Sequence, residues 1–247
     1  MSKILAFTNQ KGGVGKTTST ANIGAGLAKA GQRVLLVDLD PQTNLTKGLG
    51  LFDADQNIYG ALLGEYGLKA YALYENLALV AGSPALSGFE KMKGDELDRE
   101  FLLKELLEPV RERFDYILLD CPPALGLITI NAYACARALY VPLEAQLYAA
   151  DGLDKVMELV SRVQRRLNPT LSVGGIFFTR YDRRKILRRE TAEQLRNQYP
   201  GLVLNTAIRE SIAVGEAPHL GQDIFTYAPQ SAGAQDYQSL VDEMLTR

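Results

Sequence analysis

The 247-residue chain has few of the residues on which metal centres, disulfide frameworks and histidine-based catalysis depend. Its two cysteines, Cys121 and Cys135, are too few and too loosely spaced for a zinc site or a disulfide framework, and we expect both to be small buried residues in a reducing compartment. The single histidine, His219, leaves little room for acid–base chemistry by this residue type. No apolar run approaches the roughly 20 residues that span a bilayer. These absences indicate a cytoplasmic protein whose chemistry rests on other side chains.

Charge is nearly balanced overall but is distributed unevenly. The formal net charge is −2, which does not by itself indicate nucleic-acid binding. Between residues 162 and 196, however, ten basic residues stand against three acidic ones. An asymmetry of this kind indicates an interaction surface.

Strand-like and helix-like segments alternate along the whole chain. The pattern predicts helices over residues 17–30 and 152–167, which end at Gly31 and at Asn168-Pro169. No repeat, low-complexity segment or linker interrupts residues 1–247, and we expect no N-terminal helix-turn-helix domain. We therefore predict a single doubly wound α/β domain, with a mostly parallel twisted sheet flanked by helices. The predicted strands, several of them almost continuously apolar, are Ile4–Thr8, Val34–Asp38, Leu77–Ala81, Tyr116–Asp120, Ala138–Pro142, Leu171–Phe178 and Leu202–Thr206.

A glycine-rich segment follows the first predicted strand and opens the first predicted helix. Glycines let the backbone turn tightly and aim N–H groups at phosphate oxygens, and the helix N-terminus adds the positive end of its dipole. Lys16 can supply a charge to the β- and γ-phosphates, and the Thr17 hydroxyl can ligate Mg²⁺. The segment predicts a nucleotide-binding loop made of Lys11, Gly12, Gly13, Val14, Gly15, Lys16, Thr17 and Thr18.

One departure from the common phosphate-loop motif carries a resemblance to a known family. Gln10 stands where the first glycine is usual, and a second lysine, Lys11, opens the motif. This is the deviant Walker A form, and the chain resembles the ParA/MinD family, most of all its ParA/Soj-type partitioning ATPases. In that family the opening lysine reaches across a homodimer to the partner's nucleotide, where it can neutralise charge on the transferring phosphoryl group. The resemblance implies ATP and Mg²⁺ as cofactors, with Lys11, Lys16 and Asp40 as catalytic residues.

Acidic residues end two of the predicted strands. Asp38 and Asp40 close one strand, and Asp120 closes another. In an open α/β sheet these strand ends form the ligand crevice, where carboxylates suit the water shell of Mg²⁺. By resemblance, Asp120 is the Walker B aspartate and Asp40 positions the attacking water. The metal residues would be Thr17, which ligates Mg²⁺ directly, and Asp38 and Asp120, which act through water. The alternative for each aspartate is a turn or helix cap, and for Asp38 the two interpretations are evenly balanced.

The loops after two later strands occupy positions where the family carries contacts to the base and ribose. They cover residues 179–182 and 208–211. The resemblance assigns Arg209 and Ser211 to nucleotide contacts, and it alone favours adenine over guanine.

A basic stretch predicts a surface for nucleic acid. Arg183, Arg184, Lys185, Arg188 and Arg189 are expected to start a helix, with Arg184–Arg188 and Lys185–Arg189 at i,i+4 spacing. Like charges at this spacing repel, so contacts to phosphates, which are sequence-independent and salt-sensitive, are favoured over a solvated face or an acidic protein partner.

The resemblance supports DNA but leaves one contact open. Arg196 matches a DNA-contacting basic position of the Soj-like proteins. A second arginine is expected where this chain has Ala213, shortly before Glu216-Ala217-Pro218. Either the stretch from Arg183 to Arg189 makes the contact instead, or Arg209 compensates.

The resemblance implies a nucleoid-associated ATPase that dimerises on ATP and binds non-specific double-stranded DNA. It would drive chromosome or plasmid partition, with slow hydrolysis stimulated by a ParB-like centromere-binding protein. An alternative is the distribution of a protein cargo over the nucleoid. A MinD-like membrane switch is less favoured, because the C-terminal segment carries Asp236, Asp242 and Glu243, which anionic lipid would repel; we expect it to pack on the core. The two cysteines disfavour an iron–sulfur relative, and Lys11 disfavours a small-molecule kinase or synthetase.

Overall fold

A computed structural model describes residues 2–94, 96–146 and 149–247, and its described strands form one seven-stranded sheet. The strand order is β3-β4-β2-β5-β1-β6-β7. Every neighbouring pair is parallel except β3 and β4, which are antiparallel. The strands are β1 (Lys3–Phe7), β2 (Val34–Asp38), β3 (Tyr71–Tyr74), β4 (Leu77–Val80), β5 (Tyr116–Asp120), β6 (Ala138–Leu143) and β7 (Ser172–Phe178).

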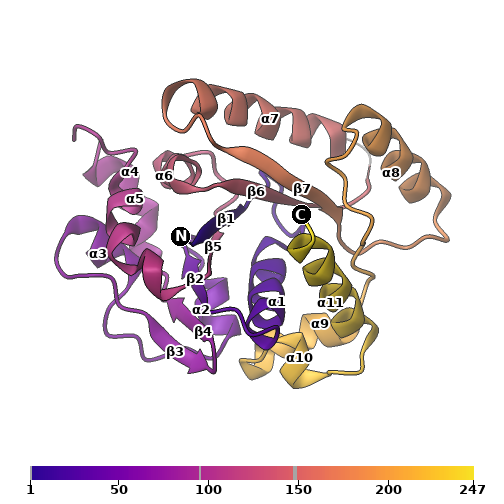
Figure 1. Ribbon diagram of the computed structural model, residues 1–247, viewed down its shortest axis with the longest axis horizontal. Helices are drawn as coiled ribbons and strands as arrows, with labels where there is room; N and C mark the ends of the chain where they lie inside the picture. The colour runs from indigo at the N-terminus through magenta and orange to yellow at the C-terminus, as the bar shows by residue number, and fades with distance from the viewer. Residues whose placement is uncertain (1, 95, 147–148) are drawn as a thin grey trace.

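Helices cover both faces of this sheet (Figure 1). They are α1 (Lys16–Lys29), α2 (Asn44–Gly48), α3 (Ile58–Leu63), α4 (Phe89–Met92), α5 (Leu102–Leu107), α6 (Leu127–Cys135), α7 (Ala149–Arg166), α8 (Ile186–Gln198), α9 (Ile212–Glu216), α10 (Ile224–Tyr227) and α11 (Ala232–Leu245). Short 3₁₀ turns occupy Pro84–Gly88, Glu108–Arg113 and Ala217–Leu220. The predicted doubly wound, mostly parallel architecture is confirmed.

Alternation along the strands divides the core into two parts. In β2, Leu35 and Val37 pack into the core that contains residues of α3, α5, α6 and α7. Val34 and Leu36 point the other way, into the core that contains residues of α1 and α11. Because side chains alternate across a strand, a sheet with apolar residues at every position must be covered on both faces.

Helix α1 lies between the sheet and α11, and two glycines permit this close approach. A Cβ on Gly24 would lie 2.5 Å from Cδ2 of Leu36, and one on Gly26 would lie 2.9 Å from Cγ2 of Val241. Tyr237 of α11 is also buried against this layer. The C-terminal helix α11 packs on the core, as predicted. Helix α1, which follows the glycine-rich loop, is therefore held by the sheet on one side and by α11 on the other.

One predicted strand is wrong, and one strand was missed. Residues 202–206 form only an isolated bridge, Val203 with Ile176, because the backbone N–H groups of Asn205 and Thr206 donate to the carboxylate of Glu243 on α11 instead of extending the sheet. The missed strand, β3, is a four-residue edge strand joined to β4 by a tight turn.

The start of α8 also differs from the prediction. The helix begins at Ile186, so Arg183, Arg184 and Lys185 precede it and the expected pairing of Arg184 with Arg188 along a helix is wrong. Asp182 causes the delay, because its carboxylate accepts the backbone N–H of Arg184 at 3.0 Å and also binds the guanidinium.

Replacing Gly24 by valine tests the contact between α1 and the sheet. The added side chain meets Leu36, so we expect Gly24→Val to lower the free energy of unfolding by about 1–3 kcal/mol in denaturant titrations. Leu36→Ala should cost about 2–5 kcal/mol alone, and the double variant should cost less than the sum of the two. Gly152→Val on α7 is the control, since its Cβ would meet no atom within 4 Å. Additive costs would show that Gly24 and Leu36 do not pack as described.

Candidate nucleotide-binding site

The glycine-rich loop lies between β1 and α1, at the carboxyl-terminal edge of the sheet. Gly13 and Gly15 adopt φ values of 75° and 84°, which glycine accepts without strain. Residues 12–18 line a cavity of about 1060 Å³, together with Asp40 and Pro123. The loop therefore presents its backbone and the start of α1 to an open cavity large enough for a nucleotide.

Lys16 is directed into this edge of the sheet and is 7% exposed. Its Nζ donates to the carbonyl oxygen of Lys11 at 3.4 Å. Burial lowers the pKa of Lys16, while the charges of Asp120 and Asp40 oppose that shift. A partly desolvated ammonium at a helix N-terminus attracts an anion strongly, as expected of a phosphate-binding lysine.

Asp120 ends β5 in a fully buried position. Its Oδ1 accepts from the Thr20 hydroxyl at 3.4 Å, and its Oδ2 has no hydrogen-bond partner among the described residues. Burial raises the pKa of Asp120 well above its usual range, with a further rise from Asp38, whereas Thr17 and Lys16 act in the opposite direction. A buried carboxylate oxygen without a partner fits a site that receives a hydrated cation.

Asp38 and Asp40 serve the loop after β2 in different ways. The carboxylate of Asp38 accepts from the backbone N–H of Asp40 at 3.2 Å, and from the N–H and hydroxyl of Thr46 at 2.9 and 2.6 Å. Asp38 thus fixes the loop and the start of α2, which is the capping alternative. Asp40 is 8% exposed, accepts the N–H of Gln42 at 2.9 Å and lines the cavity.

The side chain of Lys11 is exposed, and its contacts lie outside this cavity. Its Nζ donates to Oε1 of Gln146 at 2.6 Å, beyond the end of β6. Two lysines of one loop therefore take different directions: Lys16 faces the cavity and Lys11 does not.

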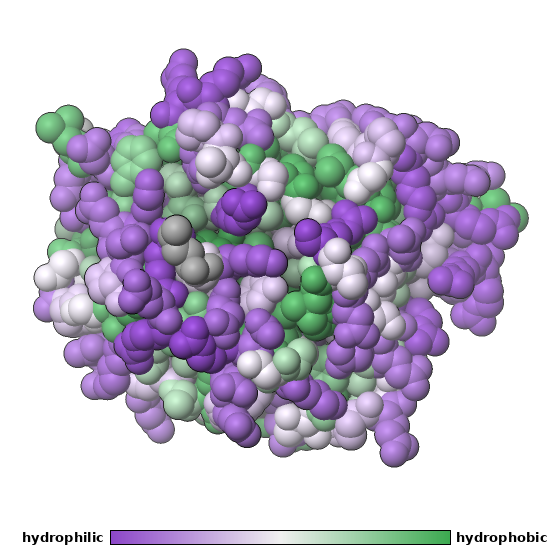
Figure 2. All heavy atoms as spheres, viewed as in Figure 1, coloured by the Kyte–Doolittle hydropathy of each residue, from purple (hydrophilic) through white to green (hydrophobic). Residues whose placement is uncertain are grey.

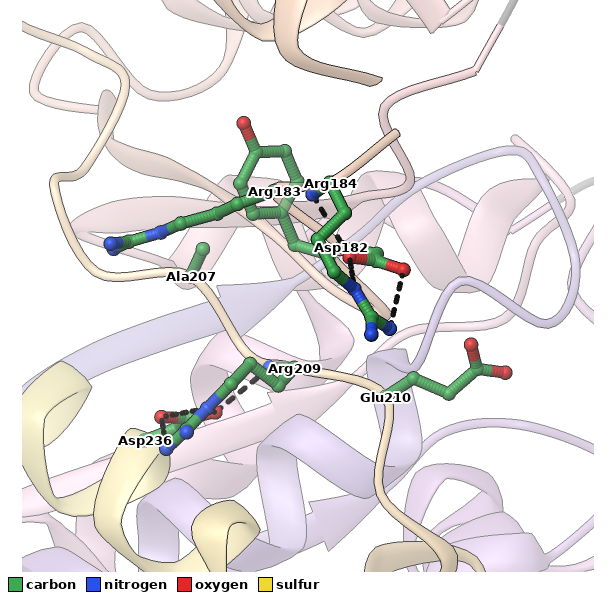
Figure 3. Close-up of a pocket in the computed structure, with 8 residues that line it drawn as sticks. Asp182, Arg183, Arg184, Ala207, Arg209, Glu210 and Asp236 are labelled. Carbon is green, nitrogen blue, oxygen red and sulfur yellow. Dashed lines mark hydrogen bonds and ion pairs between the residues drawn. The ribbon is translucent and has the colours of Figure 1, made fainter. Parts of the chain in front are cut away.

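The loop that follows residue 208 borders the cavity from the other side. Arg209 and Ser211 both line it. The guanidinium of Arg209, however, binds the carboxylate of Asp236 at 2.7 and 2.9 Å (Figure 3). Arg209 and Glu210 also line a neighbouring pocket of about 700 Å³ with Arg183, Arg184 and Asp182. Arg209 is held against α11 by this ion pair.

The six basic residues predicted to bind DNA do not form one uniform patch. Arg184 pairs with Asp182 at 3.0 Å, and the guanidinium of Arg196 lies 5.6 Å from the ring centre of Phe178. Arg188 is half-buried. Within the described part of the chain, no ion pair involves the remaining three, which are exposed: Arg183, Lys185 and Arg189.

Several residues of the site escaped the sequence analysis. Thr20 contacts Asp120, and the Thr179 hydroxyl donates to the carbonyl oxygen of Val14 at 2.8 Å, which joins the end of β7 to the glycine-rich loop. Glu144 stands directly after β6 and is 8% exposed. An acid at the end of a strand was the signal that identified Asp38 and Asp120, and it would have identified Glu144 too.

Two other expectations concern the state of the cysteines and the presence of a membrane-spanning segment. Cys121 is buried and Cys135 is half-buried; both are free thiols. In residues 2–94, 96–146 and 149–247, no group of three or more His, Cys, Asp or Glu residues could hold a metal ion. No helix of the described chain is long and apolar enough to cross a bilayer.

The buried Asp38 should give the nucleotide-free protein a measurable pH dependence. Burial raises its pKa to about 6, against about 4 in an unfolded chain. Between these two pH values the folded state binds more protons than the unfolded chain does. The stability that this provides is fully present below pH 4, and up to about 3 kcal/mol of the free energy of unfolding is lost as the pH rises through 6. We expect Asp38→Asn to flatten this part of the profile in denaturant titrations from pH 4 to 8.

Asp55→Asn is the control for that profile. Hydrogen bonds from Lys69 and Tyr71 lower the pKa of Asp55 to about 2, so its contribution is present above pH 4 and is lost only as the pH falls through 2. An unchanged slope between pH 4 and 6 in Asp38→Asn would mean that Asp38 titrates normally.

Comparisons with known proteins agree with this geometry. A family model described as an AAA domain matches residues 2–173. The chromosome-partitioning ATPase Soj of Treponema pallidum is 43% identical over 250 residues, covering 100% of this chain and 98% of that protein. The sporulation initiation inhibitor protein Soj of Bacillus subtilis is 41% identical over 250 residues, and the match covers 99% of this chain and 98% of that protein.

A solved structure gives the same fold. Cobyrinic acid a,c-diamide synthase from Mycobacterium smegmatis, with a bound ATP analogue and magnesium, has a TM-score of 0.87 and 33% identity, over 99% of this chain and 95% of that chain. The fold is that of the P-loop ATPases. From the match to the AAA domain and the identity to Soj over nearly the full length of both proteins, the chain belongs to the Soj/ParA family of chromosome-partitioning ATPases.

Proposed function

We propose that the protein is an ATP-dependent dimerising ATPase that binds non-specific double-stranded DNA in its ATP state and drives partition. The observation that carries the proposal is the divergence of the two loop lysines. Lys16 faces the subunit's own cavity, whereas Lys11 extends away from it toward Gln146. A lysine displayed outside its own cavity can contribute its charge to the nucleotide of a second subunit, as arginine fingers do in other P-loop enzymes.

The cavity residues support Mg·ATP as the ligand. Backbone N–H groups of residues 12–18 and the ammonium of Lys16 would bind the phosphates, and the cation would neutralise charge on the transferring phosphoryl group. The Thr17 hydroxyl and, through water, the unpartnered Oδ2 of Asp120 would hold the cation. Asp40 lines the cavity and would orient the attacking water, while Asp38 would act through the loop that it fixes.

The charge distribution supports DNA as the polymer that the ATP-bound protein binds. Arg183, Lys185 and Arg189 are exposed cations, and Arg183 lines a pocket shared with Arg209 and Glu210. Phosphate contacts by such residues give salt-sensitive binding without sequence preference. Since Asp236 holds Arg209, the stretch from Arg183 to Arg189, with Arg196, is favoured over Arg209 as the replacement for the arginine missing at Ala213. Two bound subunits would bring two such surfaces together and raise affinity for one duplex.

The partner and the location follow from the same proposal. A ParB-like centromere-binding protein would stimulate slow hydrolysis and return the subunits to a released state, which places the protein in the cytoplasm and on the nucleoid. Distribution of a protein cargo would use the same DNA-bound state and differ only in the partner. The likeness to a diamide synthase supports a second candidate, ATP-dependent synthesis of a small molecule, which requires no DNA-binding state.

Lys16 and Asp40 should separate nucleotide binding from turnover. Lys16→Ala removes a charge-assisted phosphate contact and should weaken Mg·ATP binding by about 10–100-fold, measured with a fluorescent ATP analogue. Asp40→Ala should still bind Mg·ATP and dimerise, with turnover reduced at least about 100-fold. Chelation of Mg²⁺ should abolish turnover in the parent protein. Asp53→Ala, an exposed acid nearby, is the control; normal turnover by Asp40→Ala would exclude Asp40 from the chemistry.

DNA binding should depend on ATP, on salt and on the exposed basic residues. We expect tight binding to non-specific duplex DNA with Mg·ATP only. Replacing Arg183, Lys185 and Arg189 by alanine should lower the slope of log K against log salt concentration by about 0.9 for each DNA phosphate that the variant no longer neutralises. Alanine at Lys91, Lys104 and Arg113 makes the same change in net charge elsewhere on the surface and is the control. Absence of DNA binding in every nucleotide state would favour the synthase candidate.

A further inference from the structure

A buried carboxylate joins two cations beside the nucleotide cavity. Glu144 is 8% exposed, and its Oε1 accepts from Nη1 of Arg180 at 3.2 Å. Its Oε2 accepts from the side-chain N–H₂ of Gln146. Both oxygens of Glu144 are therefore engaged, one by a guanidinium and the other by an amide.

The amide of Gln146 passes this interaction on to Lys11. Its Oε1 accepts from Nζ of Lys11 at 2.6 Å, while its N–H₂ group donates to Glu144. Donation to a carboxylate polarises an amide and strengthens its oxygen as an acceptor. A continuous series of contacts thus runs from Lys11 through Gln146 and Glu144 to Arg180.

Both ends of this series rest on fixed backbone. The N–H of Lys11 donates to Oδ1 of Asn9 at 3.0 Å, and Nδ2 of Asn9 donates to the carbonyl oxygen of Pro142 at 2.8 Å. At the other end Arg180 adopts a φ of 49°, a left-handed conformation that a non-glycine residue keeps only when its surroundings hold it. Thr179, the preceding residue, is bonded to the glycine-rich loop at Val14.

We propose that Glu144 and Gln146 are positioning residues for Lys11. They hold its ammonium outside the subunit's own cavity, where the ammonium would contact the nucleotide of a second subunit. The inference rests on the proposed action of Lys11 across a dimer. An ammonium has three N–H donors, of which Gln146 takes one and leaves two for phosphate oxygens. Ordering this flexible side chain before association lowers the entropy cost of dimer formation. Arg180 offsets the burial of the Glu144 charge.

The test is the dissociation constant of the ATP-bound dimer, measured by analytical ultracentrifugation with Mg·ATP in the slow-turnover Asp40→Ala background. Gln146→Ala removes one hydrogen bond in each subunit and should weaken the dimer about 10–100-fold. Glu144→Gln keeps the shape but removes the charge, and should weaken the dimer in the same direction. Gln235→Ala on α11, an exposed glutamine, is the matched control and should leave the dimer unchanged.

A double-variant cycle separates positioning from a general structural effect. If Gln146 acts through Lys11, then Gln146→Ala should cost nothing further once Lys11→Ala is present. If Gln146→Ala weakens the dimer equally with and without Lys11→Ala, the inference is overturned. It is also overturned if Gln146→Ala tightens the dimer, because Gln146 would then keep Lys11 away from the partner's nucleotide. Loss of Mg·ATP affinity in the single subunit would assign Gln146 to the cavity instead. If Lys11→Ala dimerises as fully as the parent protein, the proposed role of Lys11 across the dimer is overturned. If Lys11→Ala weakens the dimer and Gln146→Ala does not, only the positioning role of Gln146 is overturned.

Discussion

The burial of carboxylates at one edge of the sheet is the constraint around which the site is arranged. Parallel strands end at the same edge, so Asp38, Asp40 and Asp120 come close together where water is largely excluded. Burial, with a smaller contribution from neighbouring carboxylates, raises the pKa of Asp38 to about 6 and also raises the pKa of Asp120 well above its usual range. Lys16 is the buried cation that faces them, and its charge is only partial compensation. A hydrated divalent cation held by Thr17 and, through water, by Asp120 would offset this buried negative charge and leave Lys16 free for phosphate.

The sequence was sufficient for the features that depend on local pattern. Continuous apolar strands required a sheet covered on both faces, and the glycine-rich segment joins β1 to α1, as its pattern predicted. Features that depend on contacts between distant residues were not accessible. Residues 202–206 have strand composition, but Glu243 takes two of their N–H groups. The start of α8 depends instead on a local contact that the sequence analysis overlooked: Asp182, two residues before Arg184, accepts its backbone N–H and delays the helix to Ile186. In both cases a carboxylate that competes for backbone N–H groups overrides local propensity.

The same competition divides the arginines around the cavity into two groups. Asp236 holds Arg209 and Asp182 holds Arg184, and both pairs line the pocket beside the nucleotide cavity (Figure 3). These guanidinium groups are paired with carboxylates, so they add little net charge to the surface. Arg183 and Lys185 lack such partners in the described structure and lie where α8 begins, at the rim of the molecule (Figure 1). Figure 2 shows predominantly hydrophilic residues over this rim. The segment that precedes α8 therefore presents exposed cations without carboxylate partners in the described structure.

Three consecutive residues after β7 connect the cavity to that segment. Thr179 bonds to the glycine-rich loop at Val14, Arg180 binds Glu144, and the N–H of Tyr181 donates to the carbonyl oxygen of Ile208. The chain then enters the basic stretch directly. A ligand changes a distant affinity only if it favours one of two arrangements of a shared element. The end of β7 is shared by several parts of the site, because the glycine-rich loop, Glu144 and Ile208 all bond to it. A nucleotide that shifted this short run would act on residues shortly before the start of α8, and under the proposed function this is the path by which ATP would change DNA affinity.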